Sequence, residues 1–257
     1  MSLPTWTPAE LSSKASEISC KVWRMVEAQH IVSTLKIVDT RAEQELLEEI
    51  LEENKPPVPA DAVALHYLLF SPFRYDTRPP SGSRFRATNH PGVFYGAETV
   101  CTAAAEVAYW RWRFLQDTSG LTRLQPCTFT AFRVPVKTPC IDLRRPPFDA
   151  HSAVWGNPVD YSGTQAMGRS AREAGIGAVV YRSVRDPEPH FCIALLTPRA
   201  FAAKKPDSAT QTWVLAVSAQ EAIWMRQGDE AFSFRTGVWE VESRSKEPPS
   251  GHSFQKH

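Results

Sequence analysis

The first part of the chain carries a helical pattern of apolar and polar residues. Residues 7–10 (TPAE) and 40–43 (TRAE) each place a Glu three residues after a capping Thr, which is typical of helix starts. After the second capping box, residues 42–54 (AEQELLEEILEEN) form one apolar stripe on an acidic helix, which ends before Pro56 and Pro57. Because charge runs of this kind are mostly solvated helix faces, we expect exposed helices up to about residue 58.

From about residue 62 the pattern changes to short segments rich in β-branched and aromatic residues, which predict strands. These segments are residues 65–70, 128–136, 176–184, 190–197, 212–217 and 232–241. Two helical stretches lie among them, at residues 99–114 and 163–174. Because helices do not regularly separate the strands, this order predicts an α+β fold with a mixed β-sheet core rather than a doubly wound parallel sheet.

Composition narrows the class of protein. The 257 residues, 42% of them hydrophobic, suffice for one large domain with an appendage, and a net charge of +1 offers no basic field for nucleic acid. No run of about 18 apolar residues predicts a membrane span, and the N-terminus lacks a signal-peptide pattern. Five scattered cysteines without a CxxC pair indicate reduced thiols, and the histidines show no metal-ligand spacing. We therefore expect a cytoplasmic protein that binds no membrane, no nucleic acid and no metal.

The residues with the clearest chemical meaning stand in the middle of the chain. Glu106 is a single carboxylate in a helix otherwise suited to burial, where an unpaired carboxylate is costly. Arginines and tyrosines concentrate just before this helix: Arg74, Tyr75, Arg78, Arg84, Arg86 and Tyr95. Guanidinium groups bind phosphate oxygens, tyrosine rings lie against flat rings, and a carboxylate stabilises an oxocarbenium ion. This combination of arginines, tyrosines and one glutamate predicts a site for a phosphorylated nucleoside. A structural ion pair between Glu106 and an arginine would explain the same residues equally well.

Several short motifs in this region resemble the RES domain family. They are Arg74-Tyr75, Ser83-Arg84-Phe85, Phe94-Tyr95-Gly96 and Ala104-Ala105-Glu106-Val107. The intervals from Arg84 to Tyr95 and from Tyr95 to Glu106 are eleven residues each, as the family pattern expects. A later segment, residues 160–186 (DYSGTQAMGRSAREAGIGAVVYRSVRD), is similar to the family's serine segment, and the resemblance covers about residues 65–200.

The resemblance implies a toxin of a bacterial toxin–antitoxin pair whose partner is a helix-turn-helix antitoxin of the Xre type. Members of the family are similar in fold to ADP-ribosyltransferase toxins and consume NAD. The implied activity is cleavage of the nicotinamide–ribose bond of NAD, by phosphorolysis or hydrolysis, which arrests growth. The implied organisation is an N-terminal helical extension (1–60), the RES domain (61–243) and a polar, disordered tail (244–257). The number of copies that assemble stays open.

The same resemblance assigns the phosphates of NAD to two arginines and a serine. Arg74 and Arg84 are the expected arginines, with Arg78 or Arg86 as the alternative to Arg84. Ser162 is the expected serine because it opens a predicted helix, where a hydroxyl and free backbone N–H groups together hold a phosphate.

The reacting end of the substrate is assigned to two tyrosines and the glutamate. Tyr75 and Tyr95 are expected to bracket the nicotinamide–ribose end, and Glu106 to hold the ribose and stabilise the oxocarbenium-like transition state. Ser183, at the end of a predicted strand, is the rival serine. Two other functions stay open: transfer of ADP-ribose to a protein, and a non-catalytic module that binds a nucleotide or a partner. The expected catalytic residues are Glu106, Arg74 and Ser162.

Overall fold

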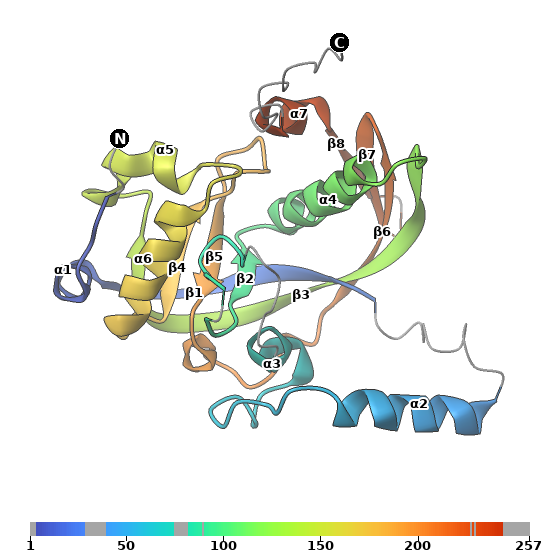
Figure 1. Ribbon diagram of the computed structural model, residues 1–257, viewed down its shortest axis with the longest axis horizontal. Coiled ribbons are helices and arrows are strands. Elements are labelled where there is room, and N and C mark those ends of the chain that lie inside the picture. Colours follow the sequence, from blue (N-terminus) through green and yellow to red (C-terminus); the bar gives the residue numbers. More distant parts are fainter. Residues whose placement is uncertain are drawn as a thin grey trace, which may run out of the picture.

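A mixed β-sheet organises the computed structural model, which describes residues 4–28, 40–74, 82–88, 90–226, 228 and 230–243 (Figure 1). Its strands are β1 (Ser16–Glu27), β2 (Phe94–Ala97), β3 (Arg123–Asp142), β4 (Ala178–Arg182), β5 (Phe191–Leu195), β6 (Gln211–Ser218), β7 (Glu221–Arg226) and β8 (Ala231–Arg235). Its helices are α1 (Pro8–Lys14), α2 (Arg41–Glu53), α3 (Tyr67–Arg74), α4 (Val100–Asp117), α5 (Ser152–Trp155), α6 (Ser162–Glu173) and α7 (Gly237–Ser243), with 3-10 turns at Phe148–His151 and Pro198–Ala200. The predicted α+β class with a mixed sheet is confirmed.

The sheet has the strand order β1-β2-β5-β4-β3-β6-β7-β8, and β1 also pairs with β3. The β3–β4 pair is parallel and the other pairs are antiparallel. Because β1 contacts both β2 and β3, the strands β1, β2, β5, β4 and β3 close into a ring. The 20-residue strand β3 then continues beyond this ring and carries the antiparallel strands β6, β7 and β8.

The N-terminal region contains a strand where a wholly helical extension is predicted. Residues 16–27 form β1, which pairs with β3 from Ser16 opposite Cys140 to Glu27 opposite Phe129. Its apolar residues alternate with polar ones, which fits the two-residue period of a strand. The helical prediction is therefore wrong for this segment, whereas the helices after the two capping boxes are confirmed as α1 and α2.

The predicted strand at residues 65–70 is also wrong, because this segment begins helix α3. Leu69 and Phe73 lie one turn apart on the helix and are both buried in the core. A short apolar run fits a strand and a buried helix equally well, so packing against the sheet decides between them here.

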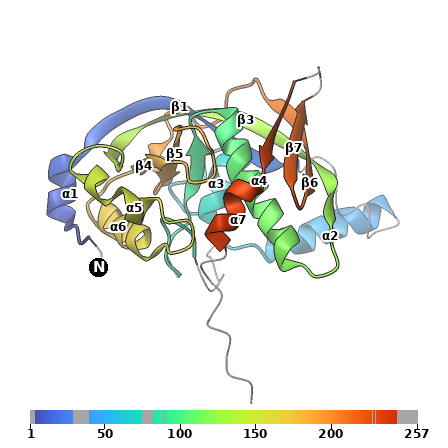
Figure 2. The same cartoon turned by 90° about the horizontal axis from the view of Figure 1, so that it is seen from above.

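The last predicted strand, residues 232–241, is correct only at its start. Strand β8 ends at Arg235, and α7 begins at Gly237. Helix α7 lies beside α4 (Figure 2). The indole of Trp239 on α7 lies with its ring centroid 5.8 Å from the rings of both Tyr109 and Trp112 of α4. The other predicted strands and the two predicted helices are confirmed as β3, β4, β5, β6, α4 and α6. The predicted tail, residues 244–257, lies outside the described residues.

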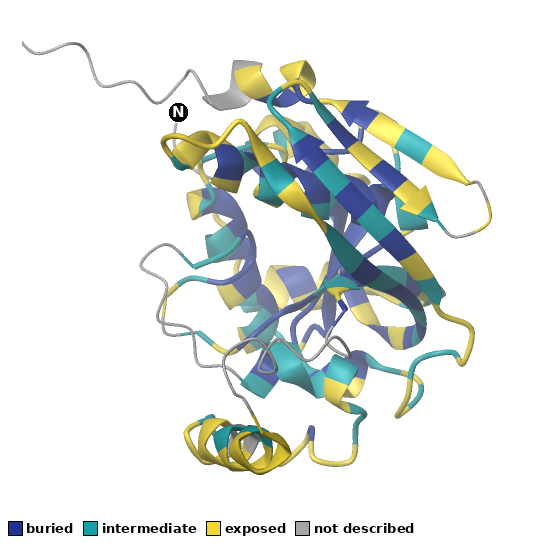
Figure 3. Ribbon diagram, turned by 90° about the vertical axis from the view of Figure 1, so that its right-hand side faces the viewer, coloured by how far each residue is buried: buried dark blue, intermediate teal, exposed yellow. Residues whose placement is uncertain are grey.

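Helices α4 and α6 cover one face of the ring of strands, and α3 packs on the other. Alternate residues of β4 and β5 are buried on the two faces: Tyr181 and Cys192 lie on the α4 side, Val180 and Ile193 on the α3 side. Helix α2 stands apart from the sheet with most of its surface exposed (Figure 3). None of the described helices is apolar over a length that could cross a membrane.

Candidate active site

A cavity of about 340 Å³ lies between α4 and the strands β1, β2, β4 and β5. Among the described residues, the charged ones that line it are Arg24, Arg84, Glu106 and Arg185. Its aromatic lining residues are Trp23, Tyr95, Trp110, Tyr161 and Tyr181. Three positive charges and one negative charge favour an anionic ligand, and the aromatic walls favour one that carries flat rings.

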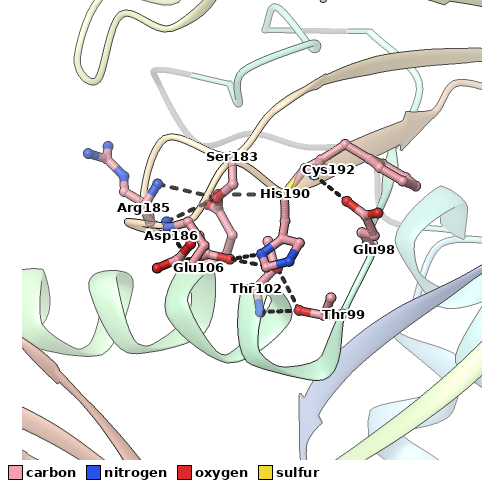
Figure 4. Close-up of polar contacts among 11 residues, drawn as sticks. Glu98, Thr99, Thr102, Glu106, Ser183, Arg185, Asp186, His190 and Cys192 are labelled. Atoms are coloured by element: carbon pink, nitrogen blue, oxygen red, sulfur yellow. Dashed lines mark hydrogen bonds and ion pairs between the residues drawn. The ribbon is translucent and has the colours of Figure 1, made fainter.

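Helix α4 brings Glu106 into this cavity. Thr99 caps the helix by accepting a hydrogen bond from the backbone N–H of Thr102, at 3.0 Å. The residues around Glu106 on this helix are small and buried, so α4 packs closely against the sheet. The Oε1 atom of Glu106 accepts hydrogen bonds from Ser183 Oγ at 2.7 Å and from Cys192 Sγ at 3.6 Å (Figure 4).

The other carboxylate oxygen of Glu106, Oε2, has no hydrogen-bond partner in the part of the chain that the structure describes. No described arginine or lysine forms an ion pair with Glu106 either. The structural ion pair considered from the sequence is therefore not present among these residues. Glu106 instead offers Oε2 to the cavity while neutral donors hold Oε1.

Ser183 follows strand β4 and is buried beside Glu106. Its Oγ atom accepts the backbone N–H groups of Arg185 at 3.3 Å and Asp186 at 3.1 Å (Figure 4). Because these two donors occupy the lone pairs of the hydroxyl, its single proton points to Glu106. The loop after β4 thus fixes Ser183 as a donor that orients the carboxylate.

Cys192 on β5 is the second neutral donor to Glu106. Burial, together with the charge of Glu106, raises the pKa of the Cys192 thiol well above its usual range. The thiol therefore stays protonated and donates to the carboxylate. Burial likewise raises the pKa of the neighbouring Tyr181 phenol well above its usual range, so this wall of the cavity carries no negative charge besides that of Glu106.

Arg24 on β1 is a cavity residue that the sequence analysis missed. It donates from one terminal nitrogen to the carbonyl of Tyr95 at 2.8 Å, and its guanidinium lies 4.6 Å from the ring centre of Phe94. Its Nε is buried and has no hydrogen-bond partner among the described residues. Burial lowers the pKa of Arg24 to about 10, so the group stays cationic at neutral pH without a described carboxylate beside it.

The signal for Arg24 is the alternation of Ile18, Cys20 and Val22, which continues to Arg24. This two-residue period predicts a strand, on which Arg24 follows the same side as the buried Val22. A charged residue in a row of inward-facing residues requires a polar or charged partner.

Arg84 lies on the turn that closes the cavity. The turn is held by hydrogen bonds between the backbones of Ser83 and Arg86, and it begins at Gly82, whose φ of +64° favours glycine. Arg84 is buried, donates to the carbonyls of Trp155 at 3.0 Å and Asn157 at 2.9 Å, and lies 4.6 Å from the ring centre of Tyr161. Arg84 also lines the cavity.

Tyr95 lines the same cavity and holds the turn in place. Its hydroxyl forms hydrogen bonds with Ser83 Oγ at 2.8 Å and with the backbone N–H of Phe85 at 3.0 Å. Burial raises the pKa of this hydroxyl above its usual value, which keeps it neutral. The structure thus brings Glu106, Arg84 and Tyr95 of the predicted set together.

Two of the other predicted arginines lie away from this cavity. Arg74 ends α3 and donates from Nε to the carbonyl of Pro56 at 2.6 Å. Arg86 is buried behind the turn and does not line the cavity. Tyr75 and Arg78 lie outside the described residues. Among the described residues, Arg24 lines this cavity and Arg74 does not.

Ser162 is exposed at the start of α6 and does not line the cavity. Its backbone N–H donates to Asp160 Oδ1 at 2.9 Å, and hydrogen bonds from Ser162 lower the pKa of Asp160. The Asp160 carboxylate thus accepts one of the backbone N–H groups at this helix start. Ser183, the rival serine, is the one that contacts Glu106.

The fold and the cavity define an α+β protein with one carboxylate among arginines and aromatic rings. The chain belongs to the RES domain family, whose model matches residues 58–218. No curated protein matches the sequence. Among solved structures, the crystal structure of the M. tuberculosis MbcT–MbcA toxin–antitoxin complex is similar, with 11% identity and a TM-score of 0.45 over 92% of this chain and 96% of that chain. The family match begins after β1, so Arg24 lies outside it.

The contacts of the two serines predict opposite results for their alanine variants. We expect Ser183→Ala to lower the release of nicotinamide from NAD about tenfold to a hundredfold, because a hydrogen bond to a charged group contributes roughly 1.5–3 kcal/mol. Ser162→Ala, the matched control, should leave the rate nearly unchanged because Ser162 is exposed and outside the cavity. The measurement is nicotinamide release at saturating NAD; a larger loss in Ser162→Ala would contradict the placement of Ser183.

Proposed function

We propose that this chain is an enzyme that cleaves the bond between nicotinamide and ribose in NAD. One observation carries the proposal: the Glu106 carboxylate, oriented by Ser183, lies in a cavity whose other charged lining residues are arginines. Membership in the RES domain family supports it. A cavity of about 340 Å³ is at the small end of ligand sites, which suits the nicotinamide–ribosyl half of the substrate with the remainder toward the opening.

Binding of NAD in this proposal rests on charge and on flat surfaces. Arg24 and Arg84 bind the pyrophosphate, since the half-buried Arg24 and the buried Arg84 both line the cavity without a described carboxylate partner. The rings of Tyr95 and Tyr181 form the wall beside Glu106 and lie against the nicotinamide–ribose end.

In the proposed reaction the glycosidic bond breaks and its electron pair leaves with the nicotinamide nitrogen, which becomes neutral. Positive charge develops on the ribose, and Glu106 Oε2 stabilises it. Ser183 and Cys192 hold Oε1, so the carboxylate is oriented before the charge appears. Water or inorganic phosphate then attacks the anomeric carbon and loses a proton to solvent.

We extend the proposal to the cell on the basis of family membership. The protein acts as a toxin that depletes NAD, and an Xre-type antitoxin neutralises it. The net positive lining of the cavity suits a dinucleotide more than a protein side chain as the first ligand. ADP-ribosyl transfer to a protein would use the same bond cleavage with a different acceptor.

Arg24 and Arg74 differ in their placement, which predicts different effects on substrate binding. Arg24→Ala should raise the KM for NAD about tenfold or more, because a charge-assisted hydrogen bond to phosphate is lost. Arg74→Ala should change KM little, because Arg74 binds the Pro56 carbonyl away from the cavity. The test measures the KM for NAD and the melting temperature of both variants. An equal rise in KM for the two would contradict the assignment of Arg24 to the pyrophosphate.

Glu106→Gln separates a catalytic carboxylate from a structural one. The amide keeps an oxygen for Ser183 but carries no charge, so turnover should fall by several powers of ten, as when a charge-stabilising group is removed. Because no described cation pairs with Glu106, the melting temperature should stay equal or rise. Thermal melting and nicotinamide release are measured on the same preparations. A large fall in melting temperature with near-normal turnover would contradict the catalytic assignment and show that Glu106 has a structural role.

The cellular proposal is tested by inducing the protein without its antitoxin. Growth should stop while the NAD concentration falls, and Glu106→Gln should abolish both effects. Growth arrest at constant NAD, with labelled NAD becoming acid-precipitable, would favour ADP-ribosyl transfer to a protein. Normal growth with normal expression would contradict the toxin assignment.

A further inference from the structure

A second hydrogen-bonded contact joins α4 to the loop after β4, next to the contact between Glu106 and Ser183. Thr102 lies four residues before Glu106, so the two side chains share one face of the helix. The hydroxyl of Thr102 donates to Asp186 Oδ2 at 2.7 Å, and both residues are buried (Figure 4). Neither of them lines the cavity that contains Glu106.

Asp186 connects this contact to Ser183. Its backbone N–H donates to Ser183 Oγ at 3.1 Å, while its Oδ1 accepts the backbone N–H of Glu188 at 3.0 Å. Its Oδ2 also lies 3.2 Å from Nδ1 of His190, at the end of the loop (Figure 4). One buried carboxylate therefore holds both ends of the loop and fixes them to α4.

A buried carboxylate is costly unless it is well hydrogen-bonded, so these partners are needed to keep Asp186 in place. Thr102 is the partner among them that comes from α4 rather than from the loop. Without its hydroxyl, the loop loses a hydrogen bond to α4 and keeps the neighbouring one from Ser183 to Glu106. The Ser183 hydroxyl would then lose its fixed geometry toward Glu106.

We propose that Thr102 and Asp186 are positioning residues, which hold residues 183–190 on α4 and thereby keep Ser183 on Glu106. The catalytic half of this assignment rests on the proposed function. The structural half, that the contact from Thr102 holds the loop, does not depend on the reaction.

The test uses variants of nearly equal shape. Thr102→Val removes the hydroxyl and should lower kcat for nicotinamide release about tenfold, the effect of one hydrogen bond to a charged group. KM for NAD should stay within about twofold, because Arg24 and Arg84 are untouched. Thr102→Ser keeps the hydroxyl and should restore kcat. Thr236→Val is the matched control, since Thr236 is also fully buried but its hydroxyl donates to the carbonyl of Ala219.

Coupling to Ser183 distinguishes positioning from a general loss of stability. In a Ser183→Ala background, Thr102→Val should lower kcat no further, because the donor that it positions is already absent. Thr236→Val should lower the melting temperature and leave kcat unchanged in both backgrounds. A full additional tenfold loss from Thr102→Val in the Ser183→Ala background would overturn the proposal.

Hydrogen exchange gives a readout that does not require turnover. Amides of residues 183–190 should exchange at least tenfold faster in Thr102→Val than in the wild type, and at the wild-type rate in Thr102→Ser and Thr236→Val. Unchanged exchange in Thr102→Val would overturn the proposal even if kcat falls. Wild-type protein that releases no nicotinamide would overturn the proposed function, and the exchange rates would then decide the structural role of Thr102.

Discussion

The hydrogen bond from Ser183 to Glu106 is the contact on which the site depends. A carboxylate on a helix of small, buried residues keeps its charge only where polar groups meet it, and here the donors come from β5 and from the loop after β4. Cys192 of β5 faces the α4 side of the ring, and the antiparallel pairing of β4 with β5 fixes the loop between these two strands. The position of one proton donor thus follows from the register of two strands and from the packing of α4 against them.

Strand β1 completes this arrangement from the other end of the chain. It pairs with β3 over its whole length and touches β2 where Trp23 lies opposite Ala97, so it closes the ring of strands. Closure places Arg24 beside Tyr95, which in turn holds the turn that carries Arg84. The two cations that reach the cavity from β1 and from the turn are therefore linked through one tyrosine. Strands far apart in the sequence produce a local concentration of positive charge.

The sequence predicts those parts of the site that short-range patterns determine. Glu106 stands out because a lone carboxylate in a buried helix is costly unless a polar group contacts it. Arg84 and Tyr95 are identified by the resemblance to the RES domain family, whose pattern expects the eleven-residue intervals before Glu106. Arg24 was missed because capping boxes on both sides favoured helix through residues 16–27, although the alternation of apolar residues was present. In β1 the pairing with β3, a long-range interaction, decided between the two patterns.

The choice between Ser162 and Ser183 shows why local chemistry was insufficient. A serine at a helix start is a sound prediction for phosphate binding, but Asp160 already accepts the N–H at this start. Ser183 is marked in the sequence only by its place at the end of a predicted strand, because its neighbours in space are Glu106, far back in the sequence, and the backbone of its own loop. Only the folded chain shows that its lone pairs are occupied and that its proton is directed to the carboxylate. The negative charge that the proposed reaction needs, on Glu106, is held by the neutral donors Ser183 and Cys192. The arginines that line the same cavity form no ion pair with Glu106 among the described residues, so in the proposed reaction a pyrophosphate would neutralise them.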